Sequence, residues 1–243
     1  MIESETRDRV TVIRIDRQEQ RNALDTVHCE DLRTAINTAE AAGARCLVIT
    51  GAGSAFCAGA DLNQVYGEQF ISALYALLRR ITEVEVPVIA AVNGPAIGAG
   101  TQLAIACDLR VAAPGAVFGV PTAKLGLAVD PWTVRRLALV AGPGAARRML
   151  LACETLDAAA VPGLVDRHGE LDTALGWAEE IAGLAPLTLT YNKLALHSML
   201  EPELTAETEH RLGEAFQACW ASADFTEAML ARTEKRAPEF HGR

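Results

Sequence analysis

The sequence has no excess of positive charge. Its 243 residues contain 22 lysines and arginines against 31 aspartates and glutamates, so the formal net charge is −9 at pH 7. Proteins that bind nucleic acid or anionic membrane surfaces rely on clusters of basic residues. We therefore expect neither as the main partner. The charge balance still leaves room for one phosphate-bearing ligand that is held by a few local arginines and lysines.

The sequence also lacks the spacings of a metal site or a redox motif. Its six cysteines include no Cys-x-x-Cys pair, and its five histidines show no metal-ligand spacing. No apolar run reaches the length of about eighteen residues that a spanning helix needs, and the first ten residues, MIESETRDRV, include five charged side chains and no apolar run. We expect no metal, no covalently bound cofactor, no membrane span, and reduced thiols in a cytoplasmic protein.

Strand and helix signals alternate along the first half of the chain. Short apolar or β-branched runs predict strands, and segments of helical spacing between them predict helices. Strands are expected at 9–16, 44–53, 86–94, 108–113 and 116–120, with helices at 26–43, 70–84 and after Gly98. The alternation predicts an α/β fold, and its strand–strand–helix order indicates a spiral rather than simple βαβ winding.

The second half of the chain is expected to be mostly helical, from about Gly142 onward. No linker or low-complexity stretch separates it from the first half. We therefore predict one domain, with a spiral core at 1–185 and a helical region at 186–243. The apolar faces of that helical region predict packing on the core or on a neighbouring subunit.

Five stretches in order carry a resemblance to a known family. They are RNALD at 21–25, GSAFCAGADL at 53–62, PVIAAVNGPAIGAGTQLAIACDLRVA at 87–112, GLVD at 163–166 and EKRAPEFHG at 234–242. Over its whole length the sequence resembles the crotonase, or enoyl-CoA hydratase/isomerase, superfamily. The resemblance implies a core of repeated ββα units and a CoA thioester as ligand or substrate. It also implies a C-terminal region that forms trimers, which can pair into hexamers.

Small residues stand where one predicted helix begins, at Gly98, Ala99 and Gly100. A helix N-terminus presents unpaired N–H groups and the positive end of the helix dipole, which suit an oxyanion. Reactions of the family pass through a thioester enolate, whose oxygen is held by two backbone N–H groups. By position in the motifs, the resemblance assigns these donors to Ala60 and Ala99. Comparable donors are worth about 3–4 kcal/mol each.

The two acids of the hydratases are absent. In the family one glutamate lies in the first turn of this helix and another follows the FG.P stretch, and here these positions hold Gln102 and Thr122. An amide and an aliphatic hydroxyl have no pKa that suits proton transfer. The sequence therefore predicts an acyl-CoA-binding protein of lipid metabolism, acting as a carrier or beside enzymes of that metabolism. It predicts that Gln102 and Thr122 line the pocket without hydratase activity.

One carboxylate, Asp130, follows Thr122 by eight residues, before Pro131. Dienoyl-CoA isomerases and an aryl-CoA dehalogenase of the family resemble the sequence there and carry a functional aspartate. Asp130 is thus a candidate base for a double-bond shift, or a candidate nucleophile, with the adjacent Trp132 expected to raise its pKa. The alternative is an aspartate that bends the chain or caps a helix. An atypical hydratase with unrecognised acids is the third hypothesis.

The resemblance also points to residues that contact CoA. It places such contacts at Arg21, Ala23, Ala58, Asp61 and Leu62, and charge adds Lys124 as a candidate for the phosphates. An aspartate at the position of Asp61 is also expected to cap the following helix. The family often reaches CoA from segments that here contain Lys193, Lys235 and Phe240, without one of them standing out.

Overall fold

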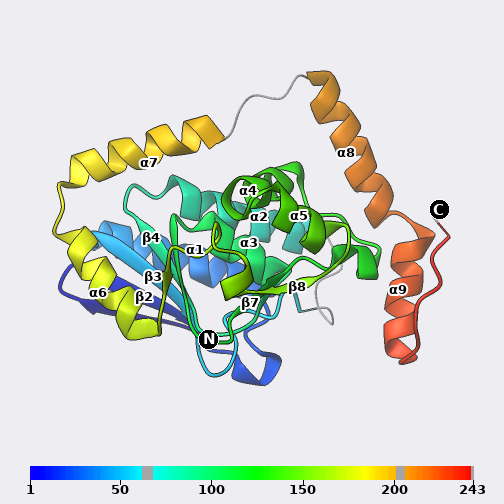
Figure 1. Cartoon of the computed structure of the whole chain (residues 1–243), viewed down its shortest axis with the longest axis horizontal. Coiled ribbons are helices and arrows are strands. Elements are labelled where there is room, and N and C mark those ends of the chain that lie inside the picture. The colour runs from blue at the N-terminus through cyan, green and yellow to red at the C-terminus, as the bar shows by residue number, and fades with distance from the viewer. Residues whose placement is uncertain (62–67, 201–205, 242–243) are drawn as a thin grey trace.

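The core of the molecule is a six-stranded sheet in the order β1-β2-β3-β4-β6-β9 (Figure 1). The computed structural model describes residues 1–61, 68–200 and 206–241. The strands are β1 (Ile2–Arg7), β2 (Val10–Ile15), β3 (Cys46–Gly51), β4 (Val88–Val92), β6 (Leu109–Ala112) and β9 (Arg167–His168). All neighbouring pairs run parallel except β1 and β2. The central strands β3 and β4 are buried at every position, as a parallel sheet covered on both faces requires.

A second, smaller layer accompanies this sheet. It contains β5 (Ala96–Ile97), β7 (Val117–Gly119) and β8 (Thr155–Asp157), and isolated bridges between Leu24 and Ala60 and between Cys57 and Ala96 extend it. Four strands of the main sheet, β2, β3, β4 and β6, are each followed by a segment of this layer and then by a helix. These helices are α1 (Thr26–Ala41), α2 (Glu68–Glu83), α3 (Ala99–Ala106) and α4 (Pro131–Ala141). The predicted spiral of ββα units is confirmed.

The two faces of the main sheet bury different sets of side chains. Ile13 and Ile49 point toward α1, α2 and α3, whereas Val12 and Val48 pack beneath α6 (Leu171–Ala182). Adjacent residues of one strand face opposite sides of a sheet, so each strand serves both cores. The larger core lies on the side of α1 to α3 and therefore supports the site described below.

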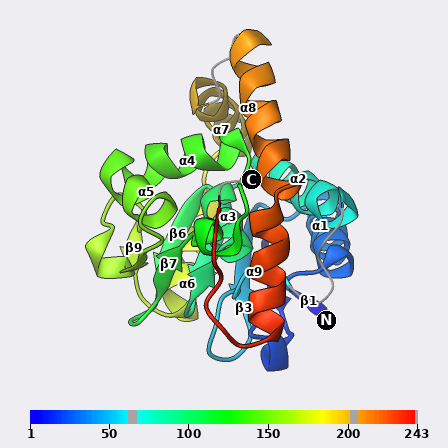
Figure 2. The same ribbon diagram turned by 90° about the vertical axis from the view of Figure 1, so that its right-hand side faces the viewer.

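The C-terminal helices extend over the ends of the core. They are α7 (Pro186–Leu200), α8 (Ala206–Trp220) and α9 (Ala223–Thr233), with α5 (Pro143–Leu150) before α6. Helices α6 and α7 lie at one end of the molecule, whereas α8 and α9 follow each other along the opposite end (Figures 1 and 2). Helix α9 packs against the 3₁₀ turn at Thr122–Leu125. No described helix is long and apolar enough to cross a bilayer.

The structure departs from the sequence prediction at the N-terminus and in the second half of the chain. Strand β1 was not predicted, because all its residues except Ile2 are exposed and its sequence, IESETR, carries no apolar alternation. The second half also contains two short strands, β8 and β9, besides its helices. Helix α7 begins at Pro186, but the division at 185/186 into core and oligomer-forming region stays a prediction.

Candidate functional site

Two glycine-containing loops, 57–60 and 96–100, run side by side between the layers. The amide of Ile97 donates to the carbonyl of Cys57 at 3.0 Å. Gly59 and Gly98 both have positive φ values, 112° and 54°, which favour glycine. A Cβ atom on Gly100 would lie 2.0 Å from the Cys57 carbonyl oxygen. Glycine is therefore required there for helix α3 to approach the first loop.

Each of these loops offers a backbone N–H group directly after its glycine. The chain around Ala60 is anchored by hydrogen bonds from Leu24 to Gly59 (2.8 Å) and from Asp61 to Leu24 (2.7 Å). Ala99 is the first residue of α3, where helix geometry leaves the N–H without an intrahelical acceptor. Within the described residues, neither the Ala60 nor the Ala99 amide has a recorded acceptor. The loops can thus present two donors to one ligand atom.

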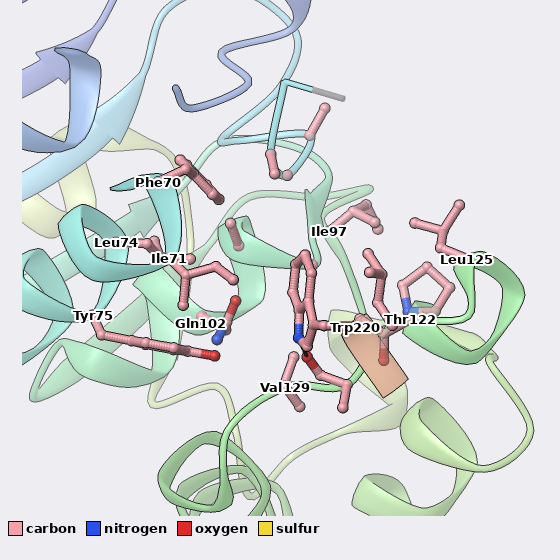
Figure 3. Close-up of a pocket in the computed structure, with 18 residues that line it drawn as sticks. Phe70, Ile71, Leu74, Tyr75, Ile97, Gln102, Thr122, Leu125, Val129 and Trp220 are labelled. Carbon is pink, nitrogen blue, oxygen red and sulfur yellow. Dashed lines mark hydrogen bonds between the residues drawn. The ribbon is translucent and has the colours of Figure 1, made fainter. Parts of the chain in front are cut away.

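Ala60 and Ala99 border a largely apolar cavity (Figure 3). Helix α2 supplies one wall, the 121–129 segment another, and Trp220 at the end of α8 closes a side. The indole Nε1 of Trp220 donates to the Ala128 carbonyl at 3.3 Å, which fixes the ring. The remaining lining is Ala58, Gly59, Phe70, Ile71, Leu74, Tyr75, Ile97, Gly98, Gln102, Pro121, Thr122, Leu125, Leu127, Ala128 and Val129.

The side-chain functional groups of the cavity are few. Gln102 and Thr122, the two positions of the missing acids, both line it together with the Tyr75 hydroxyl. No aspartate or glutamate belongs to this lining in the described part of the chain. The structure therefore brings Ala58, Ala60, Ala99, Gln102 and Thr122 together at one cavity. The roles that the sequence assigns to them stay predictions.

Gln102 is held by a chain of buried hydrogen bonds that leads to Asp130. It is 3% exposed, and its Nε2 donates to Thr133 Oγ1 at 2.8 Å. The Thr133 hydroxyl in turn donates to Asp130 Oδ1. The Asp130 carboxylate also accepts the backbone N–H of Thr133 at 3.3 Å and thereby caps α4. Capping, the alternative given for Asp130 from the sequence, is thus observed.

Asp130 itself does not border the cavity of Gln102. It lines an adjacent cavity with Arg79, Trp132 and His197, and Tyr75 stands between the two spaces because it borders both. Burial raises the pKa of Asp130, while hydrogen bonds from Thr133 and Tyr75 oppose the rise. The predicted direction of the pKa shift is confirmed, but the carboxylate reaches the first cavity only through other side chains.

The residues expected at CoA form a cluster beside the first loop. The Ala58 amide donates to the Arg21 carbonyl at 3.0 Å, and Arg17 donates to the Ala23 carbonyl at 3.0 Å. Arg17 also pairs with Asp61 at 2.8 Å. Leu62 lies outside the described residues. So does the start of the segment that Asp61 was predicted to cap. Contact of this cluster with CoA stays a prediction.

The basic residues proposed from the sequence have different surroundings. Lys124 is exposed on the 3₁₀ turn that contributes Thr122 and Leu125 to the cavity. Lys193 is 8% exposed, pairs with Asp108 at 2.7 Å, and donates to the Ile81 and Val86 carbonyls. The three ammonium protons of Lys193 therefore have acceptors within the protein, and none is left to donate to a CoA phosphate. Lys235 and Phe240 are exposed near the C-terminus.

Sequence reasoning missed Arg17, Tyr75, Thr133 and Trp220. Tyr75 lies on α2 and Thr133 on α4. The apolar spacing of a helix predicts which of its faces is buried, but not which cavity each side chain reaches. Trp220 lies 92 residues after Ala128 of the segment that contains Thr122, so no local spacing connects them. No group of His, Cys, Asp or Glu in the described chain could hold a metal ion. The described cysteines, Cys29, Cys46, Cys57, Cys107 and Cys153, are buried and unpaired.

Comparison with known proteins places this geometry in a family. The family model described as "Enoyl-CoA hydratase/isomerase" matches residues 5–243. The probable enoyl-CoA hydratase echA6 of Mycobacterium leprae (strain TN) is 45% identical over 240 residues, covering 96% of each chain.

Two solved structures share the fold over nearly their whole length. Methylmalonyl-CoA decarboxylase complexed with 2S-carboxypropyl-CoA has a TM-score of 0.91 at 25% identity, covering 100% of this chain and 98% of that chain. An enoyl-CoA hydratase/isomerase from Pseudoalteromonas atlantica T6c has a TM-score of 0.88 at 33% identity, covering 99% of each. The chain has the α/β crotonase fold and belongs to the enoyl-CoA hydratase/isomerase family.

Proposed function

We propose that this protein binds acyl-CoA and has no hydratase activity. The observation that carries the proposal is the composition of the cavity. Two free main-chain donors border it, whereas an amide and a hydroxyl occupy the positions of the two acids. The thioester oxygen would accept hydrogen bonds from Ala60 and Ala99, and the acyl chain would lie among the apolar residues of α2 and the 121–129 segment.

The residues that line the cavity suit the binding of a thioester but not its hydration. Hydration needs a base that activates water and an acid that protonates the carbon beside the thioester, each contributing typically about 10²–10⁴-fold. Gln102 and Thr122 supply neither. The solved decarboxylase that contains 2S-carboxypropyl-CoA supports a ligand that carries CoA for this fold. A place in cytoplasmic lipid metabolism, as a carrier or beside its enzymes, completes the proposal.

A second function rests on Asp130 and Tyr75. The Asp130 carboxylate is buried with a raised pKa, and the Tyr75 hydroxyl borders its space as well as the main cavity. That arrangement favours a slow double-bond isomerisation with Asp130 as the proton acceptor. Loss of slow isomerisation in Asp130→Asn would favour this function over pure binding. An atypical hydratase is the third hypothesis, and it requires acids outside the described lining.

The test restores the acids. Wild type, with crotonyl-CoA or a longer enoyl-CoA, is expected to show no loss of thioester-conjugate absorbance beyond buffer. The double variant Gln102→Glu, Thr122→Glu is expected to hydrate detectably, because the main-chain donors remain in place. The new carboxyl at position 102 would share the Thr133 hydroxyl with Asp130, so it should hold a proton and act as the acid.

Matched single variants complete this experiment. Gln102→Glu alone and Thr122→Glu alone each lack one partner and are expected to stay inactive. A wild-type protein that hydrates at an ordinary enzyme rate, on the order of 1–10³ per second, would refute the proposed function. A double variant that folds, binds acyl-CoA and stays inactive would show that the cavity no longer admits the attacking water.

The oligomeric part of the proposal rests on α7. Its side chains Leu187, Tyr191 and Leu194 follow one stripe of the helix and are 84%, 69% and 67% exposed. Such a stripe is expected to be covered in an assembly. We propose a trimer, able to pair into a hexamer, as the family resemblance implies. Light scattering that finds a stable monomer of 25.9 kDa at micromolar concentration would contradict it.

A further inference from the structure

The Gln102 amide is turned in one direction by its neighbours. Asp130 Oδ1 accepts the backbone N–H of Thr133 at 3.3 Å, so this oxygen acts as an acceptor. The Thr133 hydroxyl spends its single proton on the same Oδ1 atom. Thr133 Oγ1 can therefore only accept from Gln102, and the amide must present its NH₂ group to it. The hydrogen-bond chain thus fixes which end of the amide is nitrogen.

This orientation directs the amide oxygen of Gln102 toward the cavity. In Figure 3 the Gln102 nitrogen lies on the side of the Tyr75 hydroxyl, and the oxygen points away from it into the space beside Ile71 and Trp220. Gln102 is buried, with 3% of its surface exposed. Among the described residues, nevertheless, no group donates a hydrogen bond to its side-chain oxygen. In the described part of the chain, every fully buried side-chain nitrogen or oxygen has a hydrogen-bond partner. The Gln102 oxygen has none, so it is not fully buried, and we infer that it borders the cavity.

We propose that Gln102 selects acyl groups that carry a hydrogen-bond donor, a hydroxyl, over acyl groups that carry a carbonyl at the same carbon. This inference rests on the proposed acyl-CoA binding and names its ligand class. Thr133 and Asp130 are positioning residues, because they hold the amide and do not border the cavity. A ligand hydroxyl donates a hydrogen bond to the Gln102 oxygen. A ligand carbonyl oxygen cannot donate, so it and the Gln102 oxygen face each other as two acceptors without a proton between them.

The spacing along α3 locates the selected carbon. Gln102 follows Ala99 by three residues, so the two lie about one turn apart on neighbouring parts of the helix surface. With the thioester oxygen on the Ala99 N–H, the next groups along the acyl chain pass the Gln102 amide. A hydroxyl on carbon 3 is within reach, and 3-hydroxyacyl thioesters are the ligand class that the arrangement favours.

The experiment compares the binding of four CoA thioesters of equal chain length by calorimetry at pH 8. They are octanoyl-CoA, 3-oxooctanoyl-CoA and both stereoisomers of 3-hydroxyoctanoyl-CoA. For wild type we expect one 3-hydroxy isomer to bind about tenfold tighter than the 3-oxo compound, from one gained and one lost hydrogen bond. Gln102→Met, nearly equal in shape, should reduce this ratio to about twofold or less.

A matched pair of variants tests the hydrogen-bond chain itself. Thr133→Ser keeps the hydroxyl and should preserve the wild-type ratio. Thr133→Val keeps the shape without the hydroxyl, so the amide can turn and 3-oxooctanoyl-CoA should recover most of its affinity. This pair also serves if Gln102→Met does not fold. Threonine and valine have nearly the same size, so a role in packing alone predicts the same ratio of 3-hydroxy to 3-oxo affinity in Thr133→Val as in wild type. Only a role in positioning the Gln102 amide predicts that this ratio changes.

The outcomes separate this inference from the proposed function. If octanoyl-CoA binds but the 3-hydroxy and 3-oxo compounds bind equally, or the 3-oxo compound binds tighter, the inference is wrong and acyl-CoA binding stands. A selectivity that persists unchanged in both Gln102→Met and Thr133→Val also overturns it. If no thioester binds to wild type, the proposed function fails and the inference fails with it.

Discussion

The two walls of the cavity are built from different parts of the chain. One wall is main chain, in which loops 57–60 and 96–100 are joined by backbone hydrogen bonds and shaped by glycines. The other is formed by side chains, most of them apolar, which include the functional groups of Gln102, Thr122 and Tyr75. A side chain can be exchanged without moving the backbone, whereas a loop that depends on glycine geometry cannot. Under the proposed function, thioester binding depends on the first wall and proton transfer on the second, so one can be lost without the other.

The main-chain wall is expected to be the less tolerant, and Gly100→Ala tests it with the largest effect. The added Cβ would lie 2.0 Å from the Cys57 carbonyl oxygen, and a backbone atom cannot turn aside. We expect a loss of about 2–4 kcal/mol in the free energy of unfolding. A thermal melt should show Tm lower by roughly 5–15 °C.

Gly176→Ala is the matched control for that substitution. Gly176 is exposed in the interior of α6, and a Cβ there would meet no atom within 4 Å. Alanine should stabilise this helix by up to about 1 kcal/mol. On the side-chain wall, Thr122→Ala at a half-buried position should change Tm far less than Gly100→Ala. Equal Tm losses for Gly100→Ala and Thr122→Ala would contradict the comparison.

Removal of one main-chain donor tests the binding role of the same wall. Ala99 is the first residue of α3, where proline is tolerated and no intrahelical bond is lost. Ala99→Pro should therefore fold but lack the N–H group. Loss of one hydrogen bond to the thioester predicts roughly 3–10-fold weaker octanoyl-CoA binding by calorimetry. Ala60→Pro should weaken binding in the same way, once circular dichroism shows that it folds.

Free CoA provides the control for the donor variants. It lacks the thioester oxygen, so its affinity should be the same for wild type and Ala99→Pro. If a folded Ala99→Pro binds octanoyl-CoA as tightly as wild type does, the thioester oxygen is not held at Ala99. If both ligands weaken equally, the substitution has disturbed the CoA-contacting cluster instead.

The same contrast explains what the sequence could predict. Strands β2, β3 and β4 and helices α1 and α2 have local periodicity, because each buries one stripe or both faces in a fixed pattern. The glycine loops were predictable because their backbone geometry demands particular residues at particular positions. Motif positions therefore brought Ala60, Ala99, Gln102 and Thr122 to one cavity correctly.

The remaining features depend on contacts between distant segments. Strand β1 is formed by pairing with β2 and buries little of its own surface. Trp220 reaches the cavity from the end of α8, and its position depends on how α8 and α9 pack on the core. The bond from Gln102 to Thr133 joins helices α3 and α4, and no pattern within either helix encodes it.

The smallest effect concerns two aspartates with the same local task and opposite surroundings. Asp25 caps α1 and Asp130 caps α4, each by accepting a backbone N–H three residues on. Burial alone would raise the pKa of Asp25, but hydrogen bonds and charge from His28 and Arg17 outweigh it and lower that pKa. At Asp130, burial prevails over hydrogen bonds from Thr133 and Tyr75 and raises the pKa.

The two pKa shifts predict opposite pH dependence of stability. Folded Asp25 binds a proton less readily than the unfolded chain does, so its stabilisation is present above the ordinary pKa of about 3.9 and is lost as pH falls through the folded pKa. Folded Asp130 binds a proton more readily than the unfolded chain. Its contribution is therefore largest below about pH 3.9 and is lost as pH rises through the folded pKa.

Asn substitutions isolate these contributions because asparagine caps helices about as well as aspartate does. The advantage of wild type over Asp25→Asn should grow as pH rises from acid toward neutral, whereas its advantage over Asp130→Asn should shrink. Unfolding transitions of the three proteins, measured in parallel from about pH 3.5 to 7, cancel the titration of all other groups. Each change of about 1 kcal/mol would move Tm by about 2–4 °C. Because the prediction is a difference in sign, two variants with the same slope would show that folding lowers the pKa of Asp130 as it lowers that of Asp25. The candidacy of Asp130 as a buried proton acceptor with a raised pKa would end there.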